Sequence, residues 1–245
     1  MELSPRNLAI ISYLKEHSEV QIEHLATLFE VTTQTIRRDV NLLCEQGLAR
    51  RIHGGLSLPA NLTNSSYQFR REIECDAKMA IAQAVARQIP VGSTVMMGIG
   101  TSMAYVAHFL AGFTELRVIT NNLQVAKTLE NSPNIEVYLS GGLVRCDHQD
   151  VVGQTTLKFF ADFEADIGLV GCSSVTSNHT AMEHEPQEAE ISKAIITNAR
   201  QNWLLADASK WERFGSVKVA NLSEFSRIFT NKTGLPNELP VSTVS

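Results

Sequence analysis

Four arginines lie close together near the start of the chain. Arg37, Arg38, Arg50 and Arg51 fall within residues 32–55, where two acidic residues accompany them. A guanidinium group pairs with phosphate oxygens and also reads base edges in the major groove of DNA. The segment therefore predicts a surface that binds nucleic acid.

The net charge of the whole chain is −5, so this positive charge is local. Residues 1–60 carry six Lys and Arg against seven Asp and Glu, and the remaining residues carry 15 against 19. An acidic background disfavours indiscriminate attraction to DNA phosphates. The distribution favours a protein that binds particular DNA sequences over one that coats DNA.

The first arginine pair belongs to a predicted amphipathic helix. Ile36, Val40 and Leu43 recur at the spacing of one helix face, which leaves the polar and cationic side chains on the other faces. Thr32 or Thr33 can cap the start of this helix by accepting hydrogen bonds from its first amides. The helix should therefore dock on a core through one side and expose its arginines on the other.

A second, shorter helix is predicted just upstream. Residues 21–29 place Ile22, Leu25 and Leu28 on one face, and a tight turn separates this segment from the arginine-bearing helix. Gly47 can end the latter in a left-handed conformation. Two short helices joined in this way are typical of a helix-turn-helix.

The second arginine pair belongs to a predicted β-hairpin. Residues 48–58 have the composition of strands, with Gly54-Gly55 at the turn. A hairpin beside a helix-turn-helix is a wing, which can contact the DNA backbone while the helix enters the major groove. The residues expected to contact DNA are Thr33, Gln34, Thr35, Arg37, Arg38, Asn41, Arg50, Arg51 and His53.

A first helix should pack beneath the helix-turn-helix. Ser4 and Pro5 form a typical helix start, and Leu8, Ile11 and Leu14 supply an apolar stripe.

Further along, short apolar strands alternate with amphipathic helices, which is typical of an α/β domain with a largely parallel sheet. The predicted strands are 94–97, 116–120, 135–139, 167–170, 203–206 and 227–230, and the predicted helices are 76–89, 105–110, 123–130, 157–160 and 187–199. We therefore expect a winged helix-turn-helix domain over 1–58, a Pro-, Asn- and Ser-containing linker over 59–75, an α/β domain over 76–233 and a disordered tail over 234–245.

Small and polar residues directly follow several of these strands. In an open α/β sheet, ligands bind beyond the carboxyl ends of the strands. Glycines allow close approach, a helix N-terminus supplies amides, and Arg or Lys neutralises an anion. Together they predict a pocket for a small phosphorylated polyol or sugar. The segments concerned are Gly98-Ile99-Gly100-Thr101-Ser102, Thr120-Asn121-Asn122, Ser140-Gly141-Gly142 with Arg145, and Asp207, Ser209 and Lys210.

The chain resembles the DeoR family of bacterial transcriptional regulators. TIRRDVNLL and GLARRIHGGLSLP are similar to the winged helix that opens those proteins, and IGTS, TNN, the GG pair with Arg145, and ADASK are similar to their effector domain. The resemblance extends to about residue 231. It implies an effector domain with a fold like ribose-5-phosphate isomerase and CoA-transferases, and within the family the pattern is most similar to the glycerol-3-phosphate repressors.

The resemblance also implies roles for single residues. The phosphate would be held by residues 100–102 and Lys210. The rest of the ligand would lie near Asn121, Arg145, Glu188 and Asp207. The full set expected around the effector is Gly100, Thr101, Ser102, Asn121, Asn122, Gly141, Gly142, Arg145, Glu188, Asp207 and Lys210.

Two positions depart from the family pattern. Gly98 stands where an acidic residue is usual, and Ser192 stands where a lysine is common, although Lys193 is next to it. Recognition of the ligand's hydroxyl groups is therefore expected to differ.

Neither a metal nor a cofactor is expected. His53 and His108 have no second ligand at i+3 or i+4. Residues 179–190 hold two histidines among four glutamates and could attract a cation, but such charge runs are usually solvated, and we expect an acidic loop that enters a helix. The cysteines lack metal or disulfide spacing, so reduced thiols are expected at Cys44, Cys75, Cys146 and Cys172.

Two functions fit these observations. The first is a repressor of carbohydrate or polyol catabolic genes, not itself an enzyme, which a phosphorylated sugar or glycerol-3-phosphate-like effector releases from double-stranded operator DNA. One winged helix contacts few bases, so a homo-oligomer, a dimer or a tetramer, is expected. The alternative is a sugar-phosphate isomerase or CoA-transferase-like enzyme that carries a DNA-binding domain, with Asp207 and Glu188 as its candidate acid and base. Apolar runs are too short to span a membrane and no signal peptide is evident, so a cytoplasmic protein without membrane contacts is expected.

Overall fold

The computed structural model describes residues 3–17, 19–45, 48–57, 67–212 and 215–244. The chain forms two compact units, Met1–Arg70 and Arg71–Ser245, which are described separately below. The division falls within α4 (Tyr67–Glu72). The division lies within the predicted linker of 59–75, of which residues 67–72 are helical and residues 59–66 lie outside the described part.

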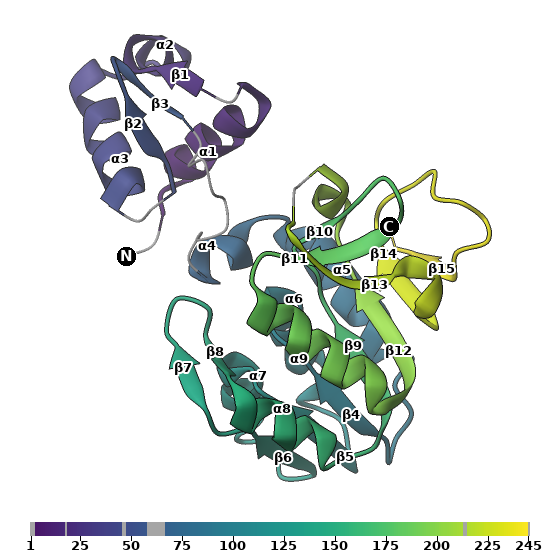
Figure 1. Cartoon of the computed structure of the whole chain (residues 1–245). Coiled ribbons are helices and arrows are strands. Elements are labelled where there is room, and N and C mark those ends of the chain that lie inside the picture. Colours follow the sequence, from purple (N-terminus) through teal and green to yellow (C-terminus); the bar gives the residue numbers. More distant parts are fainter. Residues whose placement is uncertain (1–2, 18, 46–47, 58–66, 213–214, 245) are drawn as a thin grey trace. The chain divides into compact units, whose positions relative to one another are not determined.

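The first unit combines helices with a small antiparallel sheet of order β1-β3-β2 (Figure 1). Its elements are α1 (Pro5–His17), β1 (Glu19–Gln21), α2 (Ile22–Leu28), α3 (Thr33–Glu45), β2 (Arg50–Ile52) and β3 (Gly55–Ser57). The hairpin of β2 and β3 is the predicted wing, whereas β1 was not predicted. The fully buried side chains of this core are Ile10, Leu14, Leu25, Ile36, Val40, Leu43 and Leu56.

The apolar face of α2 differs from the prediction at one residue. Ile22, Leu25 and Ala26 are buried and Phe29 is half-buried, which is the i, i+3, i+4, i+7 pattern of a docked face. Leu28 lies off that face and is 48% exposed. The prediction that Leu28 shares the face of Ile22 and Leu25 is therefore wrong, because the docked face continues through Ala26 and Phe29 instead. Gly47, which was predicted to end α3, lies outside the described residues.

The second unit is built on a seven-stranded parallel sheet of order β15-β14-β12-β9-β4-β5-β6 (Figure 1). The strands are β4 (Thr94–Met97), β5 (Leu116–Thr120), β6 (Ile135–Leu139), β9 (Ala165–Val170), β12 (Ala199–Leu205), β14 (Arg227–Thr230) and β15 (Val241–Thr243). The predicted α/β fold is confirmed, and four of the six predicted strands have the predicted bounds. The tail was wrongly expected to be disordered, because β15 pairs with β14 through Val241, Ser242 and Thr243.

Helices cover both faces of this sheet. Alternate residues of β4 face opposite ways: Val95 and Met97 pack with one core cluster, and Met96 packs with the other. The first cluster contains α5 (Cys75–Ala86), α6 (Thr101–Leu110) and α7 (Leu123–Leu129), and the second contains α8 (Gln154–Ala161) and α9 (Pro186–Thr197). Among the described residues, no helix has the length and apolar character needed to cross a membrane.

Several shorter elements of the second unit were not predicted. They are the antiparallel hairpin of β7 (Leu143–Arg145) and β8 (Asp150–Val152), the antiparallel sheet of β10 (Ser174–Val175), β11 (Thr180–Glu183) and β13 (Val217–Asn221), and the 3-10 turns η2 (Ala208–Glu212) and η3 (Leu222–Glu224). Residues 179–190 are not a solvated loop, as predicted, because β11 occupies part of them and both Glu183 and Glu188 are 4% exposed.

Candidate functional site

The helix α3 presents its polar side chains to the solvent. Arg37 and Arg38 are exposed, and Ile36 and Val40 are fully buried on the opposite side. The start of the helix is capped by Thr32, whose Oγ1 accepts a hydrogen bond from the amide of Thr35 at 3.2 Å. Of the residues expected to contact DNA, Thr35 is half-buried, and the exposed ones are Thr33, Gln34, Arg37, Arg38, Asn41, Arg50, Arg51 and His53.

One acidic residue on α3 was not singled out from the sequence. Asp39 follows the arginine pair directly, but it points inward and is 8% exposed. Its carboxylate accepts hydrogen bonds from Arg6 on α1, at 2.6 Å from Nε and 3.3 Å from Nη2. The side-chain bond to Asp39 raises the pKa of Arg6. This ion pair links the inner side of α3 to α1.

The wing contacts α3 through a side chain. Arg51 on β2 donates a hydrogen bond to Oδ1 of Asn41 on α3 at 2.6 Å. Gly54 has a φ of +76°, and a Cβ there would lie 2.6 Å from Oε1 of Gln21, so the hairpin turn requires glycine. The structure therefore brings Arg51 and Asn41 together, two residues that the sequence predicted separately for DNA contact.

In the second unit, the segments after β4 and β5 meet at the carboxyl edge of the sheet. Asn122 caps α7, with Oδ1 accepting from the amides of Gln124 and Val125 at 3.0 and 3.2 Å. Its Nδ2 donates to the carbonyl oxygen of Gly100 at 3.0 Å. Asn122 therefore ties the loop that opens α6 to the loop that opens α7.

The start of α6 has the form of an anion site. Gly100 immediately precedes the helix with a φ of +108°, a conformation that other residues rarely adopt. The first amides of a helix have no partner within it and carry partial positive charge. Gly100, Thr101 and Ser102 therefore lie where a phosphate could accept hydrogen bonds from backbone amides.

Next to this loop, Asn121 is completely buried. Its Nδ2 donates to the carbonyl oxygen of Val151 on β8 at 2.7 Å, while its Oδ1 has no hydrogen-bond partner. Gly142 is held in a tight place, because a Cβ there would lie 2.7 Å from the carbonyl oxygen of Val152. These contacts attach the β7–β8 hairpin to the end of β5.

Arg145 is enclosed by carboxylates. Its Nε and Nη2 donate to the two carboxylate oxygens of Asp150 at 2.8 and 2.6 Å, and Nη2 lies 3.2 Å from Oε1 of Glu188. His148 Nδ1 lies 3.3 Å from the same oxygen. Burial lowers the pKa of Arg145, but these carboxylates outweigh it and the pKa is raised. Arg145 and Glu188 do meet, as expected, but Asp150 and His148 complete the cluster and were missed.

Glu188 has a second structural role at the start of α9. It forms a reciprocal capping box with Glu185. Burial raises the pKa of Glu188, and the hydrogen bond with His148 and the charge of Arg145 outweigh it, so that the pKa is lowered. The carboxylate is therefore charged at neutral pH.

The segment after β12 forms the other side of the same sheet edge. Asp207 is 1% exposed and accepts hydrogen bonds from the amide and the hydroxyl of Ser209 at 3.1 and 2.5 Å. Lys210 is half-buried in η2. Burial raises the pKa of the Cys172 thiol, after β9, to about 12, although the charge of Lys210 opposes this.

Glu183 lies at this edge and was missed. It accepts a short hydrogen bond from Ser173, the second residue beyond Gly171 at the end of β9. Glu183 belongs to a run of glutamates that was predicted to be solvated. Its partner, Ser173, lies ten residues earlier, so the sequence did not reveal the contact.

Other expectations concern single positions. A Cβ on Gly98 would lie 3.0 Å from Cδ1 of Ile195, so an acidic side chain at 98 would have to displace that residue. Ser192 is buried at 3% exposure, and Lys193 is exposed. The four cysteines are free, and the described residues contain no group of three or more His, Cys, Asp or Glu that could hold a metal ion.

Two family models match the chain. Residues 6–61 match the DeoR-like helix-turn-helix domain, and residues 73–232 match the DeoR C terminal sensor domain. The chain belongs to the DeoR family of transcriptional regulators. This DeoR regulator is 37% identical over 231 residues to the glycerol-3-phosphate regulon repressor of Escherichia coli, covering 94% of this chain and 92% of that protein. It is 35% identical to the transcriptional repressor CsqR of Escherichia coli, covering 94% and 88%.

Solved structures show a weaker likeness to the DeoR regulator. A D-ribose-5-phosphate isomerase in complex with phospho-erythronic acid matches with a TM-score of 0.41 and 14% identity, over 56% of this chain and 53% of that one.

Proposed function

We propose that this DeoR regulator represses carbohydrate or polyol catabolic genes as a homo-oligomer, and that a phosphorylated sugar or glycerol-3-phosphate-like effector releases it from operator DNA. The observation that carries the proposal is the coexistence of an exposed arginine helix in one unit and an amide-lined sheet edge in the other. The first suits the phosphates and bases of DNA, and the second suits a small anion.

The DNA side rests on α3 and the wing. Arg37 and Arg38 project from a helix whose opposite face is fully buried, so their loss leaves the core intact. The major groove, about 12 Å wide, admits a helix of this kind. The exposed Arg50 on β2 suits the flanking phosphates.

The effector side rests on the loop of Gly100 and on Lys210. Amides at the start of α6 and a half-buried ammonium group supply the donors and the positive charge that a phosphate needs. Asn121 supplies a buried carbonyl oxygen without a partner, which suits a hydroxyl group of the ligand. Arg145 is neutralised by Asp150 and Glu188, so we assign it to shaping the site and not to the phosphate.

The enzyme alternative finds less support in these contacts. A general acid or base works best with a pKa near the operating pH. The pKa of Glu188 is shifted the other way, and its carboxylate is held by Arg145, His148 and the capping box. We infer that Glu188 is structural and that the protein is not an enzyme.

Ligand titrations test this function directly. Glycerol 3-phosphate, ribose 5-phosphate and inorganic phosphate, with glycerol as the control without a phosphate, are screened for a rise in the melting temperature of the full chain. The best ligand is then titrated into a mixture of protein and operator DNA, and the mixture is analysed for product. Release of DNA without turnover supports the proposal. Turnover of the sugar phosphate, with DNA occupancy unchanged, would overturn it.

A further inference from the structure

Exposed apolar side chains gather at one edge of the sheet in the second unit. Tyr138 and Leu139 on β6 are 39% and 43% exposed, and Leu143 and Val144 on β7 are 65% and 50% exposed. Three residues separate these two strands, and within each strand the two side chains point to opposite faces. Four exposed apolar side chains within residues 138–144 still make this end of the sheet a candidate interaction surface.

The backbone of β6 is also open on its outer side. The amide of Leu116 donates to Asn134 O, and the amide of Ser140 donates to Thr120 O. In a parallel pair, the N–H and C=O groups of alternate residues point to the same neighbouring strand. Those of Glu136 and Tyr138 therefore point to β5, and those of Val137 and Leu139 point outward. Within the described part of the chain, no strand pairs with that outer side.

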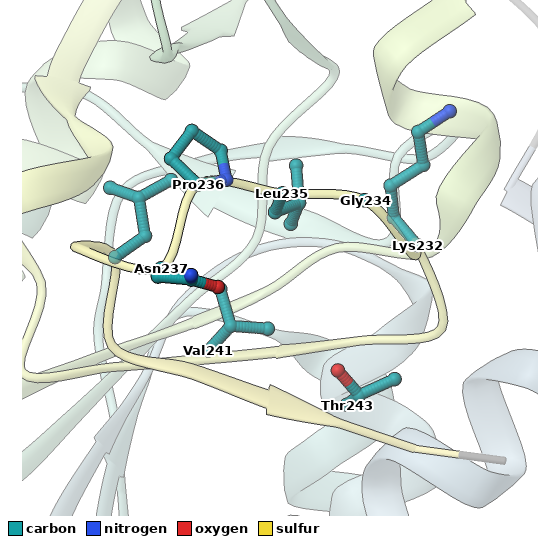
Figure 2. A pocket seen from close by; sticks show the side chains of 8 residues that line it. Lys232, Gly234, Leu235, Pro236, Asn237, Val241 and Thr243 are labelled. Carbon is teal, nitrogen blue, oxygen red and sulfur yellow. The ribbon is translucent and has the colours of Figure 1, made fainter.

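A loop precedes the strand at the opposite edge of the sheet, β15. Lys232 and Pro236 belong to the loop that leads into β15, and with Val241 and Thr243 they line a pocket of about 250 Å³ beside the strand (Figure 2). Lysine, proline and a covering loop are the usual devices that prevent an edge strand from pairing. β6 carries no lysine or proline that would prevent pairing on its outer side.

We propose that β6 pairs with β6 of a second copy of this chain, antiparallel and centred on Val137, so that the two sheets join across a two-fold axis. Antiparallel pairing about Val137 makes Val137 its own partner, and its outward N–H and C=O then form the closely spaced pair of hydrogen bonds. A two-fold contact uses the same patch on both copies, which an edge strand satisfies. Leu143 and Val144 extend the contact beside the strand.

Charges on this surface are complementary under the same two-fold operation. Arg117 on β5 lies 2.8 Å from Glu136, and its guanidinium carbon lies 5.7 Å from the ring centre of Tyr138. The pairing places Tyr138 opposite Glu136 of the second copy. Each Arg117 then stands between two carboxylates, its own and that of the second copy, which favours a second copy over an unrelated partner.

The inference that the partner on β6 is a second copy of this chain also rests on the proposed function. A regulator with one winged helix per chain needs a second copy to occupy repeated half-sites. β7 carries both the exposed Leu143 and the half-buried Arg145, so the pairing surface and the carboxylate cluster share one three-residue strand.

Hydrogen exchange of the full chain without DNA tests the pairing. We expect the amides of Val137 and Leu139 to exchange at least tenfold more slowly at concentrations where sedimentation shows two or more copies than in the dilute monomer. The amides of Glu136 and Tyr138 serve as internal controls, because β5 holds them in either state. Equal exchange of Val137 at both concentrations, in a protein that does self-associate, would overturn the proposal.

A pair of variants at one position provides a second readout. Val137→Pro removes an outward N–H that the single chain does not use, and proline is tolerated on an edge strand, whereas Val137→Thr keeps the N–H and the side-chain shape. We expect the proline variant to lose the β6 contact and sediment with fewer copies, and the threonine variant to behave like wild type. Leu143→Glu should weaken association without touching β6.

Unchanged association in both Val137→Pro and Leu143→Glu contradicts the pairing, as does a wild-type chain that stays monomeric at all concentrations. If Val137→Pro fails to fold, the exchange measurement on the wild type decides. A wild type that pairs through Val137 but ignores every phosphorylated ligand supports the pairing while it overturns the proposed function.

Discussion

Arg6 on α1 donates two hydrogen bonds to Asp39 on α3, from Nε to Oδ2 at 2.6 Å and from Nη2 to Oδ1 at 3.3 Å. Asp39 directly follows the arginines that face the solvent, so the ion pair holds the inner side of the helix whose outer side we assign to DNA. A small rotation of α3 would move Arg37 and Arg38 relative to the bases.

Removal of Arg6 should cost more than removal of its partner. Arg6→Ala leaves the buried carboxylate of Asp39 unpaired, at about 1–3 kcal/mol for the first unit, whereas Asp39→Asn leaves an arginine that is one-third exposed and can be hydrated. Denaturant unfolding of both variants and of the double variant measures the coupling. Equal effects, with no coupling, would contradict a stabilising ion pair.

Arg37→Ala and Arg38→Ala should each weaken operator binding at least tenfold and leave the melting temperature within a few degrees of wild type. The reason is that both side chains are exposed and lie away from the buried face of α3. A base contact of this kind is worth about 1–3 kcal/mol. Mobility-shift titration measures the affinity, and Arg87→Ala, an exposed arginine on the other unit, is the matched control. Wild-type affinity in a folded variant would remove α3 from the DNA surface.

The two wing arginines should differ in how they respond to salt. Arg50 is exposed, so Arg50→Ala should weaken binding to all DNA sequences. The slope of log affinity against log salt concentration should fall by about one. Arg51 already donates to Asn41, so Arg51→Ala should also affect sequence preference through the helix. Affinities for operator and random DNA at several salt concentrations separate the two. Identical behaviour of the two variants would show that the bond to Asn41 has no role in recognition.

The sequence predicted the elements that a pattern of consecutive residues specifies. β4, β5 and β6 are apolar runs of four or five residues bounded by turn residues, and the structure has them at the predicted bounds. β7, β8 and β10 are two or three residues long, too short for a periodic pattern, and their pairing partners supply the stability.

The site was predictable where a residue's role follows from its place after a strand. Asn121 and Asn122 do lie at the carboxyl edge, with Asn122 tied to Gly100. The roles of Asp39 and Glu183 depend on partners from other elements, Arg6 and Ser173, which no spacing rule along the chain connects to them. The sequence alone therefore could not distinguish these two buried carboxylates from solvated ones.

Acid should destabilise the second unit partly through Glu188. A carboxylate with a lowered pKa in the folded state adds stability above its ordinary pKa of 4.5, and that stability is lost as the pH falls through the folded value. Glu188→Gln should therefore melt at a lower temperature than wild type at pH 7, and the difference should shrink as the pH falls below about 4.5. Glu190→Gln, an exposed residue of the same helix, should show no such convergence. Parallel pH profiles for Glu188→Gln and wild type would refute a stabilising role for the charge.

Lys210→Ala should leave operator binding intact and remove the response to the effector. Lys210 belongs to the second unit, and an effector shifts DNA binding only through its different affinity for the two states, so a weaker effector contact removes the shift. The expected variant is a repressor that the metabolite no longer releases. Lys218→Ala, an exposed lysine on β13 of the same unit, should respond like wild type.

The same titration separates regulation from catalysis. An enzyme would turn over a sugar phosphate in the wild type and lose that activity in Lys210→Ala, with DNA occupancy unaffected in both. A regulator shows the reverse, with no product in either protein and a ligand-dependent loss of DNA in the wild type alone. If Lys210→Ala still releases DNA at the wild-type ligand concentration, the phosphate does not depend on Lys210. The amides that begin at Gly100 and Thr101 would then hold it on their own.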